Sequence, residues 1–275
     1  MSYELTDLTK SPKEIIFQLL TSERSQLLIP PQYSREQIEI SELFSDEKSV
    51  GLFSSGSTAH PKCIWNTFEN LLLNAKQSAG AFEINSGYRL LILAKPWHVA
   101  GLSWALMAEQ LDCEYEFLTT NGGEEGQWLA AINEFSPDYI LTVPPVLRAI
   151  YDKEWFVPNI IFGGTPFEFK DFDLLSSHCS TMYQGYGQTE AGGLIAAHKY
   201  ISSKTPKYNE HKNCGIPIDG VKLKSVGTFS QPSEIYIKSD TAFVESWYNS
   251  GDMGYVENSE IHLTGRSEKV ISEKN

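Results

Sequence analysis

The stretch Arg89-Leu90-Leu91-Ile92-Leu93-Ala94 decides the fold, because every residue after Arg89 is apolar and an extended chain would present them on both faces. Strands buried on both faces are typical of parallel sheets covered by helices on their two sides. Similar apolar runs recur, with helical spacing of apolar residues between them. Strands are expected at 113–118, 139–143 and 159–162, and helices at 69–81, 101–110, 126–135 and 146–151. This alternation predicts an α/β fold of layered, mostly parallel sheets, with a ligand crevice at the carboxyl ends of the strands.

A different pattern begins near residue 204. Apolar and polar residues alternate in three segments that Gly, Pro, Asn and Ser separate: 221–226, 234–238 and 260–264. Such alternation is typical of antiparallel strands with one solvated face. We therefore predict an α/β core over residues 1–203 and a smaller antiparallel β-rich subdomain over 204–265. The polar, proline-containing segment 202–212 is the expected linker.

Composition excludes several classes of protein. The 275 residues are 41% apolar, enough for the core of one large domain or two modest ones. The net charge of −13 argues against nucleic acid as a partner, and the lack of a run of about 18 apolar residues argues against membrane insertion. Because the N-terminus lacks the apolar stretch of a signal peptide, a cytoplasmic location is expected. The cysteines are widely spaced, which favours buried thiols over a zinc site or disulfides: Cys63, Cys113, Cys179 and Cys214.

A hydroxyl-rich turn follows a short apolar run and reads Phe-Ser-Ser-Gly-Ser-Thr-Ala-His-Pro-Lys over residues 53–62. Its hydroxyls and backbone N–H groups suit phosphate oxygens, Gly56 permits close backbone approach, and Lys62 adds a positive charge. It is not a Walker loop, because Gly-Lys-Ser/Thr does not follow Gly56 at the required spacing. An ordinary solvated turn has the same composition. The candidate phosphate-binding residues are Ser54, Ser55, Gly56, Ser57, Thr58 and Lys62.

Three further motifs follow this loop in a fixed order. They are Tyr186-Gly187-Gln188-Thr189-Glu190, then Ser250-Gly251-Asp252 with Gly254-Tyr255, then Gly265-Arg266-Ser267-Glu268. Together with the loop, they resemble the motifs of the acyl-adenylate-forming ligases, the superfamily of acyl-CoA synthetases, luciferase and nonribosomal adenylation domains. The resemblance runs from about Val50 to Ser272 and implies the fold of an acyl-CoA synthetase N-terminal domain.

The resemblance implies a reaction in two steps. A carboxylic acid and ATP give an acyl-adenylate and pyrophosphate, and CoA then takes the acyl group. The hydroxyl-rich loop would hold the β- and γ-phosphates, the Thr189 hydroxyl would meet the α-phosphate, and Glu190 would bind Mg²⁺, for which oxygen ligands are suited. A Thr-Glu pair also commonly starts a helix.

The same resemblance implies how the nucleoside would be held. Tyr186 would stack on the adenine, and Asp252 would accept hydrogen bonds from the two ribose hydroxyls. Arg266 would lie close to the ribose and phosphate, although a surface arginine has the same sequence signature. The remaining adenine-site residues would be Gly163, Gly164, Thr165 and Gly187, since glycine lets a backbone approach a planar base.

For the acid, the chain is most similar in spacing to the compact o-succinylbenzoate–CoA ligases of menaquinone biosynthesis. Pro96 to Gly101 resembles the family's Pro-x-x-His-x-x-Gly with one residue fewer, which implies His98 near the acyl group. Gly185 would lie at the same acyl pocket. Arg148, in a segment similar to Val-Pro-x-x-Leu-x-Arg, would bind a second carboxylate of the acid, but it also fits a solvated helical arginine.

Two departures from the family pattern stand out. The phosphate loop has Ala59-His60 where relatives usually carry Gly-x. Glu268 marks the family's hinge, so 266–275 is expected to be a hinge stub leading to an absent C-terminal domain, and the chain alone is expected to be poorly active. An aryl or fatty acid ligase and a noncatalytic nucleotide-binding module remain alternatives. The expected partners are a carboxylic acid, ATP with Mg²⁺, and CoA, and a homodimer is left open.

Overall fold

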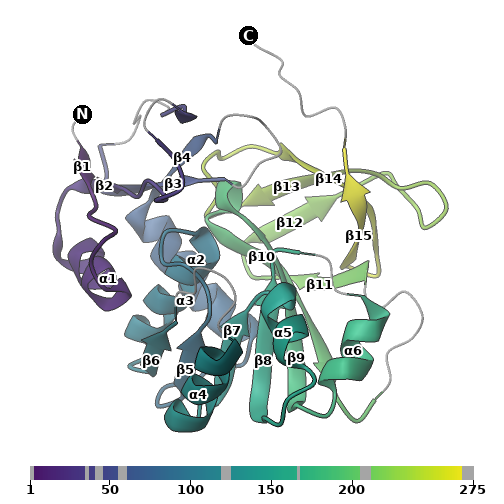
Figure 1. Ribbon diagram of the computed structural model, residues 1–275. Coiled ribbons are helices and arrows are strands. Elements are labelled where there is room, and N and C mark those ends of the chain that lie inside the picture. The colour runs from purple at the N-terminus through teal and green to yellow at the C-terminus, as the bar shows by residue number, and fades with distance from the viewer. Residues whose placement is uncertain are drawn as a thin grey trace.

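Two sheets of unequal size organise the chain (Figure 1). The computed structural model describes residues 3–34, 37–40, 46–54, 61–118, 125–165, 168–204 and 212–267. A four-stranded sheet has the order β1-β2-β3-β4, and an eleven-stranded sheet has the order β12-β13-β14-β15-β11-β10-β9-β8-β7-β5-β6. No helix within these ranges is both long and apolar enough to cross a membrane.

The smaller sheet is built from the first part of the chain. Its strands are β1 (Tyr3–Leu5), β2 (Ser25–Leu27), β3 (Ser49–Phe53) and β4 (Cys63–Thr67). The first three strands pair in parallel, whereas β3 and β4 form an antiparallel hairpin. Helix α1 (Pro12–Thr21) connects β1 to β2 and begins at a capping box, in which Ser11 and Glu14 each bind the other's backbone N–H.

The larger sheet contains five parallel strands, of which the alternating pattern predicts the first four and not β9. They are β5 (Arg89–Ile92), β6 (Glu114–Phe117), β7 (Tyr139–Thr142), β8 (Val157–Gly163) and β9 (Cys179–Gln188). Helix α2 (Phe68–Ala81) precedes them, and the helices between them are α3 (Val99–Gln110), α4 (Glu125–Phe135), α5 (Pro144–Ile150) and α6 (Phe169–Leu175). Alternate residues of β5 enter different cores: Leu90 and Ile92 pack with α2 and α3, and Leu91 packs with α4 and α5.

The antiparallel strands extend this same sheet. They are β10 (Gly193–Ile201), β11 (Asn213–Pro217), β12 (Val221–Lys224), β13 (Ser233–Ser239), β14 (Tyr248–Glu257) and β15 (Glu260–Arg266). Strand β10 pairs with β9 on one side and with β11 on the other, where Ala197 lies opposite Ile216. The predicted core and the predicted β-rich subdomain therefore share one continuous sheet. The four cysteines are buried thiols outside any disulfide, as expected.

Candidate functional site

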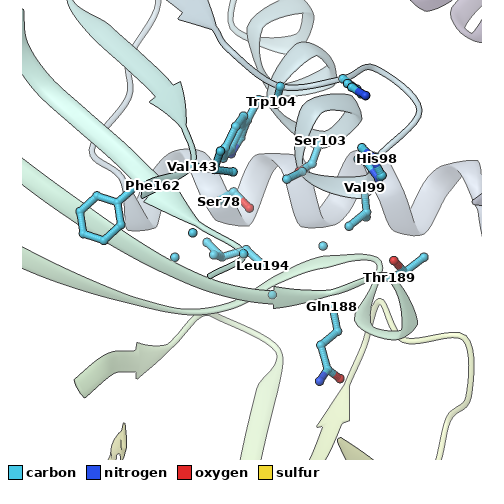
Figure 2. A pocket seen from close by; sticks show the side chains of 18 of the residues that line it. Ser78, His98, Val99, Ser103, Trp104, Val143, Phe162, Gln188, Thr189 and Leu194 are labelled. Atoms are coloured by element: carbon cyan, nitrogen blue, oxygen red, sulfur yellow. The ribbon is translucent and has the colours of Figure 1, made fainter. Parts of the chain in front are cut away.

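A cavity of about 870 Å³ lies between helices α2 and α3 and the ends of strands β5, β7, β8 and β9. Figure 2 shows Phe162 and Val143 toward one end of it and Thr189 toward the other. Its apolar part is lined by Phe82, Leu93, Trp104, Leu118, Trp128, Val143, Val146, Phe162 and Leu194. Its polar part is lined by Ser54, Gly163, Gly164, Gly187, Thr189, Glu190, Ser250 and Arg266. The cavity therefore joins a wall suited to a hydrocarbon group to a set of polar groups suited to phosphates and sugar.

The floor of the cavity is bare backbone. A Cβ atom on Gly187 would lie 2.5 Å from the Gly193 carbonyl oxygen, and one on Gly163 would lie 2.5 Å from the Gly185 carbonyl oxygen. Side chains are thus sterically excluded along two neighbouring strands, which leaves room for a flat ligand. Gly163, Gly164, Gly185 and Gly187, which were assigned from the sequence to the adenine and acyl sites, all line the cavity, whereas Thr165 is exposed and is not among the lining residues.

Thr189 and Glu190 lie in a short 3₁₀ turn, η2 (Thr189–Ala191), at the end of β9. Both residues line the cavity. Among the residues that the structure describes, Glu190 is the cavity's lining carboxylate, and its side chain has no recorded ion pair or hydrogen bond there. Burial, and then the charge of Glu190, raise the pKa of the Tyr248 hydroxyl nearby. An unpaired carboxylate at the polar end of the cavity fits a hard cation such as Mg²⁺, with phosphate and water as its other ligands.

Tyr186 and Asp252 contact each other next to Arg266, which lines the cavity, but neither of the two lines it. The Tyr186 hydroxyl donates a 2.6 Å hydrogen bond to Asp252 Oδ2, and the Gln188 amide donates one of 2.8 Å to the same oxygen. Arg266 Nε lies 2.9 Å from Asp252 Oδ1. Burial and the neighbouring Asp252 raise the pKa of Tyr186 well above its usual value. The motifs are therefore brought together, but Tyr186 belongs to a buried apolar cluster with Ile195, Ile235, Ile237 and Ile261, the third core cluster, and does not line the cavity.

His98 stands at the N-terminus of α3, and its side chain makes no capping hydrogen bond. It lines the cavity together with Lys95, and Figure 2 shows it on the side of α3 nearest Thr189. Burial, and then the positive charge of Lys95, lower the pKa of His98. The imidazole is therefore neutral at pH 7, with one nitrogen available to accept a hydrogen bond.

The phosphate loop is only partly described. Ser54 lines the cavity, and its backbone N–H bonds the Lys62 carbonyl oxygen at 3.2 Å, which brings the two ends of the loop together. Lys62 itself lines a second cavity, of about 910 Å³, together with Lys238 and Asp240. The other predicted phosphate residues and the hinge residue lie outside the described residues: Ser55, Gly56, Ser57, Thr58 and Glu268.

Arg148 is the one predicted acid-binding residue that the structure directs elsewhere. Its guanidinium forms two hydrogen bonds with Asp171, of 2.8 Å and 2.5 Å, and it is not among the residues that line the cavity. Although burial of Asp171 opposes the shift, Arg148 and the Glu168 backbone N–H lower the pKa of that carboxyl group. The helix expected at 146–151 is present as α5 but begins two residues earlier, at Pro144, and Val143, Pro145 and Val146 line the cavity. The side chain instead links α5 to α6.

Sequence reasoning missed several lining residues. Trp104 and Ser103 of α3, and Lys95 just before it, contribute to the wall. Helix α3 is apolar around most of its circumference, and eight of its residues are buried, so no amphipathic pattern indicates which side faces the cavity. The position of Lys95, three residues before His98, was the available signal.

Comparison with known proteins identifies the family. Residues 7–243 match the AMP-binding enzyme family. The 2-succinylbenzoate–CoA ligase of Bacillus licheniformis is 25% identical over 85% of this chain and 53% of its own length. The 4-coumarate–CoA ligase 3 of Arabidopsis thaliana is 26% identical over 86% of this chain and 48% of its own length.

A solved structure shares the fold. The o-succinylbenzoate coenzyme A synthetase of Bacillus subtilis, in complex with ATP and magnesium ion, superposes with a TM-score of 0.70 at 20% identity, over 96% of this chain and 64% of the other. The chain spans about half the length of the curated relatives named above. Since the family match covers most of the chain and agrees with the order of the motifs, the chain belongs to the AMP-binding enzyme family.

Proposed function

We propose that this chain provides the nucleotide- and acid-binding part of an ATP-dependent acid–CoA ligase. The observation that carries the proposal is the cavity in which an apolar wall meets Thr189, Glu190 and a glycine floor. Adenylation requires a carboxylate and the α-phosphate to be held in line in one enclosed space. A cavity that is apolar at one end and polar at the other meets that requirement.

In the first step, a carboxylate oxygen of the acid attacks the α-phosphorus of ATP, and pyrophosphate leaves. The Thr189 hydroxyl would donate to the α-phosphate, and Ser54 with the loop that ends at Lys62 would bind the β- and γ-phosphates. Glu190 would hold Mg²⁺, which neutralises charge on the phosphate oxygens when it is bound. Gly163, Gly164 and Gly187 would lie against the adenine, while Asp252 and Arg266 would bind the ribose.

In the second step, the thiol of CoA attacks the acyl carbon, and AMP leaves with the electron pair of the acyl–phosphate bond. The neutral His98 imidazole lies on the cavity wall and would donate its one N–H to an oxygen of the reacting group, which is a carboxylate before adenylation and an acyl carbonyl after it. Neutrality matters there, because a cation would bind the carboxylate too tightly in its unreacted state.

As the acid we propose o-succinylbenzoate, which several relatives and solved structures carry in their names. Its second carboxylate needs a cationic partner when it is buried. Because Arg148 is paired with Asp171, Lys95 is the better candidate. Lys95 lines the cavity and has no recorded ion pair among the described residues, while its ammonium lies 5.7 Å from the centre of the Trp97 ring.

The test is ATP–pyrophosphate exchange with o-succinylbenzoate, 4-coumarate and a fatty acid as separate substrates. We expect exchange with o-succinylbenzoate that Thr189→Val reduces by about 10²-fold or more, the usual loss when a group that stabilises developing charge is removed. Thr181→Val is the matched control, since Thr181 lies on the same strand and does not line the cavity.

The same assay separates the alternatives. Exchange with 4-coumarate alone would favour an aryl acid ligase, the activity named for the Arabidopsis relative. Binding of ATP without exchange for any acid would favour a noncatalytic nucleotide-binding module. If the chain binds no ATP at all, the proposed function is wrong.

A further inference from the structure

Asp252 is held by donors from three different residues, and they are distributed unevenly between its two oxygens. Oδ2 accepts hydrogen bonds from the Tyr186 hydroxyl at 2.6 Å and from Gln188 Nε2 at 2.8 Å. Oδ1 faces Arg266 Nε at 2.9 Å. Each carboxylate oxygen has two acceptor positions, so Oδ2 is saturated, whereas Oδ1 keeps one position open among the residues that the structure describes.

The two sets of donors also differ in exposure. Tyr186 and Gln188 are 8% and 9% exposed, so their bonds to Oδ2 are shielded from water. The Arg266 side chain is 61% exposed, and it lines the cavity. A ligand could therefore displace or share Arg266, but it cannot reach the bonds that Tyr186 and Gln188 make without opening the core.

Gln188 fixes the position of Asp252 in a second way. The same amide nitrogen donates a 2.9 Å hydrogen bond to the Ser250 carbonyl oxygen, two residues before Asp252. Figure 2 shows the Gln188 side chain pointing away from the labelled residues of α2 and α3, on the far side of strand β9 from the cavity. Gln188 is among the residues that line the cavity, but its side-chain amide bonds both the backbone and the carboxylate of the β14 turn.

We propose that Gln188 is a positioning residue for nucleotide binding, which holds Asp252 so that Oδ1 alone is offered to the ribose. This proposal rests on the proposed function, because it takes the ribose of ATP as the group that Asp252 binds. Without Gln188, Oδ2 would regain an open acceptor position and the carboxylate could rotate, so its contact with the ribose would weaken.

A merely structural tie between β9 and β14 is the competing interpretation, and the two differ in what they predict for a nucleotide without ribose hydroxyls. We would measure the Kd of ATP and of 2′,3′-dideoxy-ATP by calorimetry for the wild type, Gln188→Met and Gln184→Met. Gln184 is the matched control: it lies on the same face of β9 and is also buried, and its amide bonds Cys214 and Tyr200 instead of Asp252.

We expect the wild type to bind ATP about tenfold or more tightly than the dideoxy nucleotide, the usual size of a hydrogen bond to a charged group. Gln188→Met should weaken ATP binding about five- to tenfold and leave the dideoxy nucleotide unchanged. Gln184→Met should change neither Kd. Equal weakening of both nucleotides by Gln188→Met, or no weakening of either, would overturn the proposal.

Two further outcomes keep the inference and the proposed function distinguishable. If the wild type binds both nucleotides equally, the ribose is not recognised and the inference fails, while the proposed function stands. If Gln188→Met does not fold, Tyr186→Phe provides the same test, because it removes the Tyr186 hydroxyl, which is the other donor to Oδ2. Tyr186→Phe should then weaken ATP but not the dideoxy nucleotide, and equal effects on both would contradict the proposal.

Discussion

Lys95 replaces Arg148 as the proposed partner of the second carboxylate, because Lys95 lines the cavity and Arg148 is paired with Asp171. If Lys95 binds the second carboxylate of the acid, Lys95→Met should weaken binding of o-succinylbenzoate about tenfold or more, since a charged hydrogen bond is lost, and should leave a monocarboxylic aryl acid nearly unchanged. Arg148→Met is the comparison, and it should affect neither acid directly because its guanidinium is bound to Asp171. Calorimetric titration with both acids would decide, and selective loss in the Arg148 variant would restore the prediction made from the sequence.

Glu190 offers a second test at the scale of one residue. Its carboxylate lines the cavity and has no recorded partner among the described side chains, so Glu190→Gln should remove the magnesium dependence of ATP binding. We expect the affinity for ATP with Mg²⁺ to fall about tenfold and the affinity for ATP with a chelator to stay unchanged, since amides are weaker ligands than carboxylates. Full magnesium dependence in the Glu190→Gln variant would place the metal elsewhere.

His98 makes a prediction about pH. Burial and Lys95 lower its pKa in the folded protein, so below about pH 6.5 the unfolded chain takes up a proton that the folded chain does not. The contribution of neutral His98 to the free energy of unfolding is therefore fully present above that pH, and it is lost as the pH falls through the folded pKa. His98→Gln should make the free energy of unfolding, measured by urea titration, depend less on pH between 7 and 5. An unchanged slope would mean that His98 is solvated; His262, whose pKa is also lowered by burial, leaves some slope in either case.

Glycine positions and the order of the motifs were the sequence features that indicated residues of the site. Gly163, Gly164, Gly185, Gly187, Thr189 and Glu190 line the cavity as expected. The directions of Tyr186 and Arg148 were not predictable, because they depend on Asp252 and Asp171, which lie 66 and 23 residues away along the chain. The local sequence does not indicate with which distant carboxylate a side chain will form a hydrogen bond or ion pair.

At the scale of elements, helices α5 and α6 are joined by the Arg148–Asp171 pair. Asp171 is almost fully buried and also accepts the Glu168 backbone N–H at 2.7 Å, so Asp171→Asn should destabilise the protein by about 1–3 kcal/mol. The lower end allows for the partial exposure of Arg148 to water. Asp173→Asn, on the exposed side of the same helix, is the control and should change the unfolding free energy little. Equal effects of the two substitutions in urea titrations would mean that the pair contributes nothing beyond a surface charge.

The elements were easier to predict from the sequence than their pairing. Apolar runs gave the strands near 89–94 and 139–143 within a residue or two, because burial on both faces leaves a local signature. The β9–β10 hairpin was not foreseen, and neither was its role in joining the parallel strands to the antiparallel ones. Strand β10 also pairs with β11, where Ala197 lies opposite Ile216. The residues between β10 and β11 do not indicate from the sequence that these two strands pair.

For the whole molecule, the continuous eleven-stranded sheet predicts how the chain unfolds. The third core cluster contains Tyr186 and Ile195 from one side of residue 204 and Ile235, Ile237 and Ile261 from the other. Separating the two regions would expose that cluster, so we expect a single cooperative transition and not two. The prediction of a boundary near residue 204 would then describe a change of topology within one folding unit.

Unfolding in the presence of ATP is the control for the prediction of a single transition. Because Gly187 and Thr189 lie on β9 and the turn that ends it, and Asp252 lies on β14, ATP would contact strands on both sides of that boundary. At a concentration of 100 times its Kd, ATP should stabilise the whole transition by about 2.7 kcal/mol. Calorimetry and tryptophan fluorescence should agree on the midpoint of unfolding without ATP, and should agree again on the higher midpoint with ATP. They should agree because the tryptophans of the parallel half report the same unfolding event that calorimetry measures. A second transition that ATP does not shift would mean that the antiparallel strands unfold independently, despite the hydrogen bonds that join them to β10.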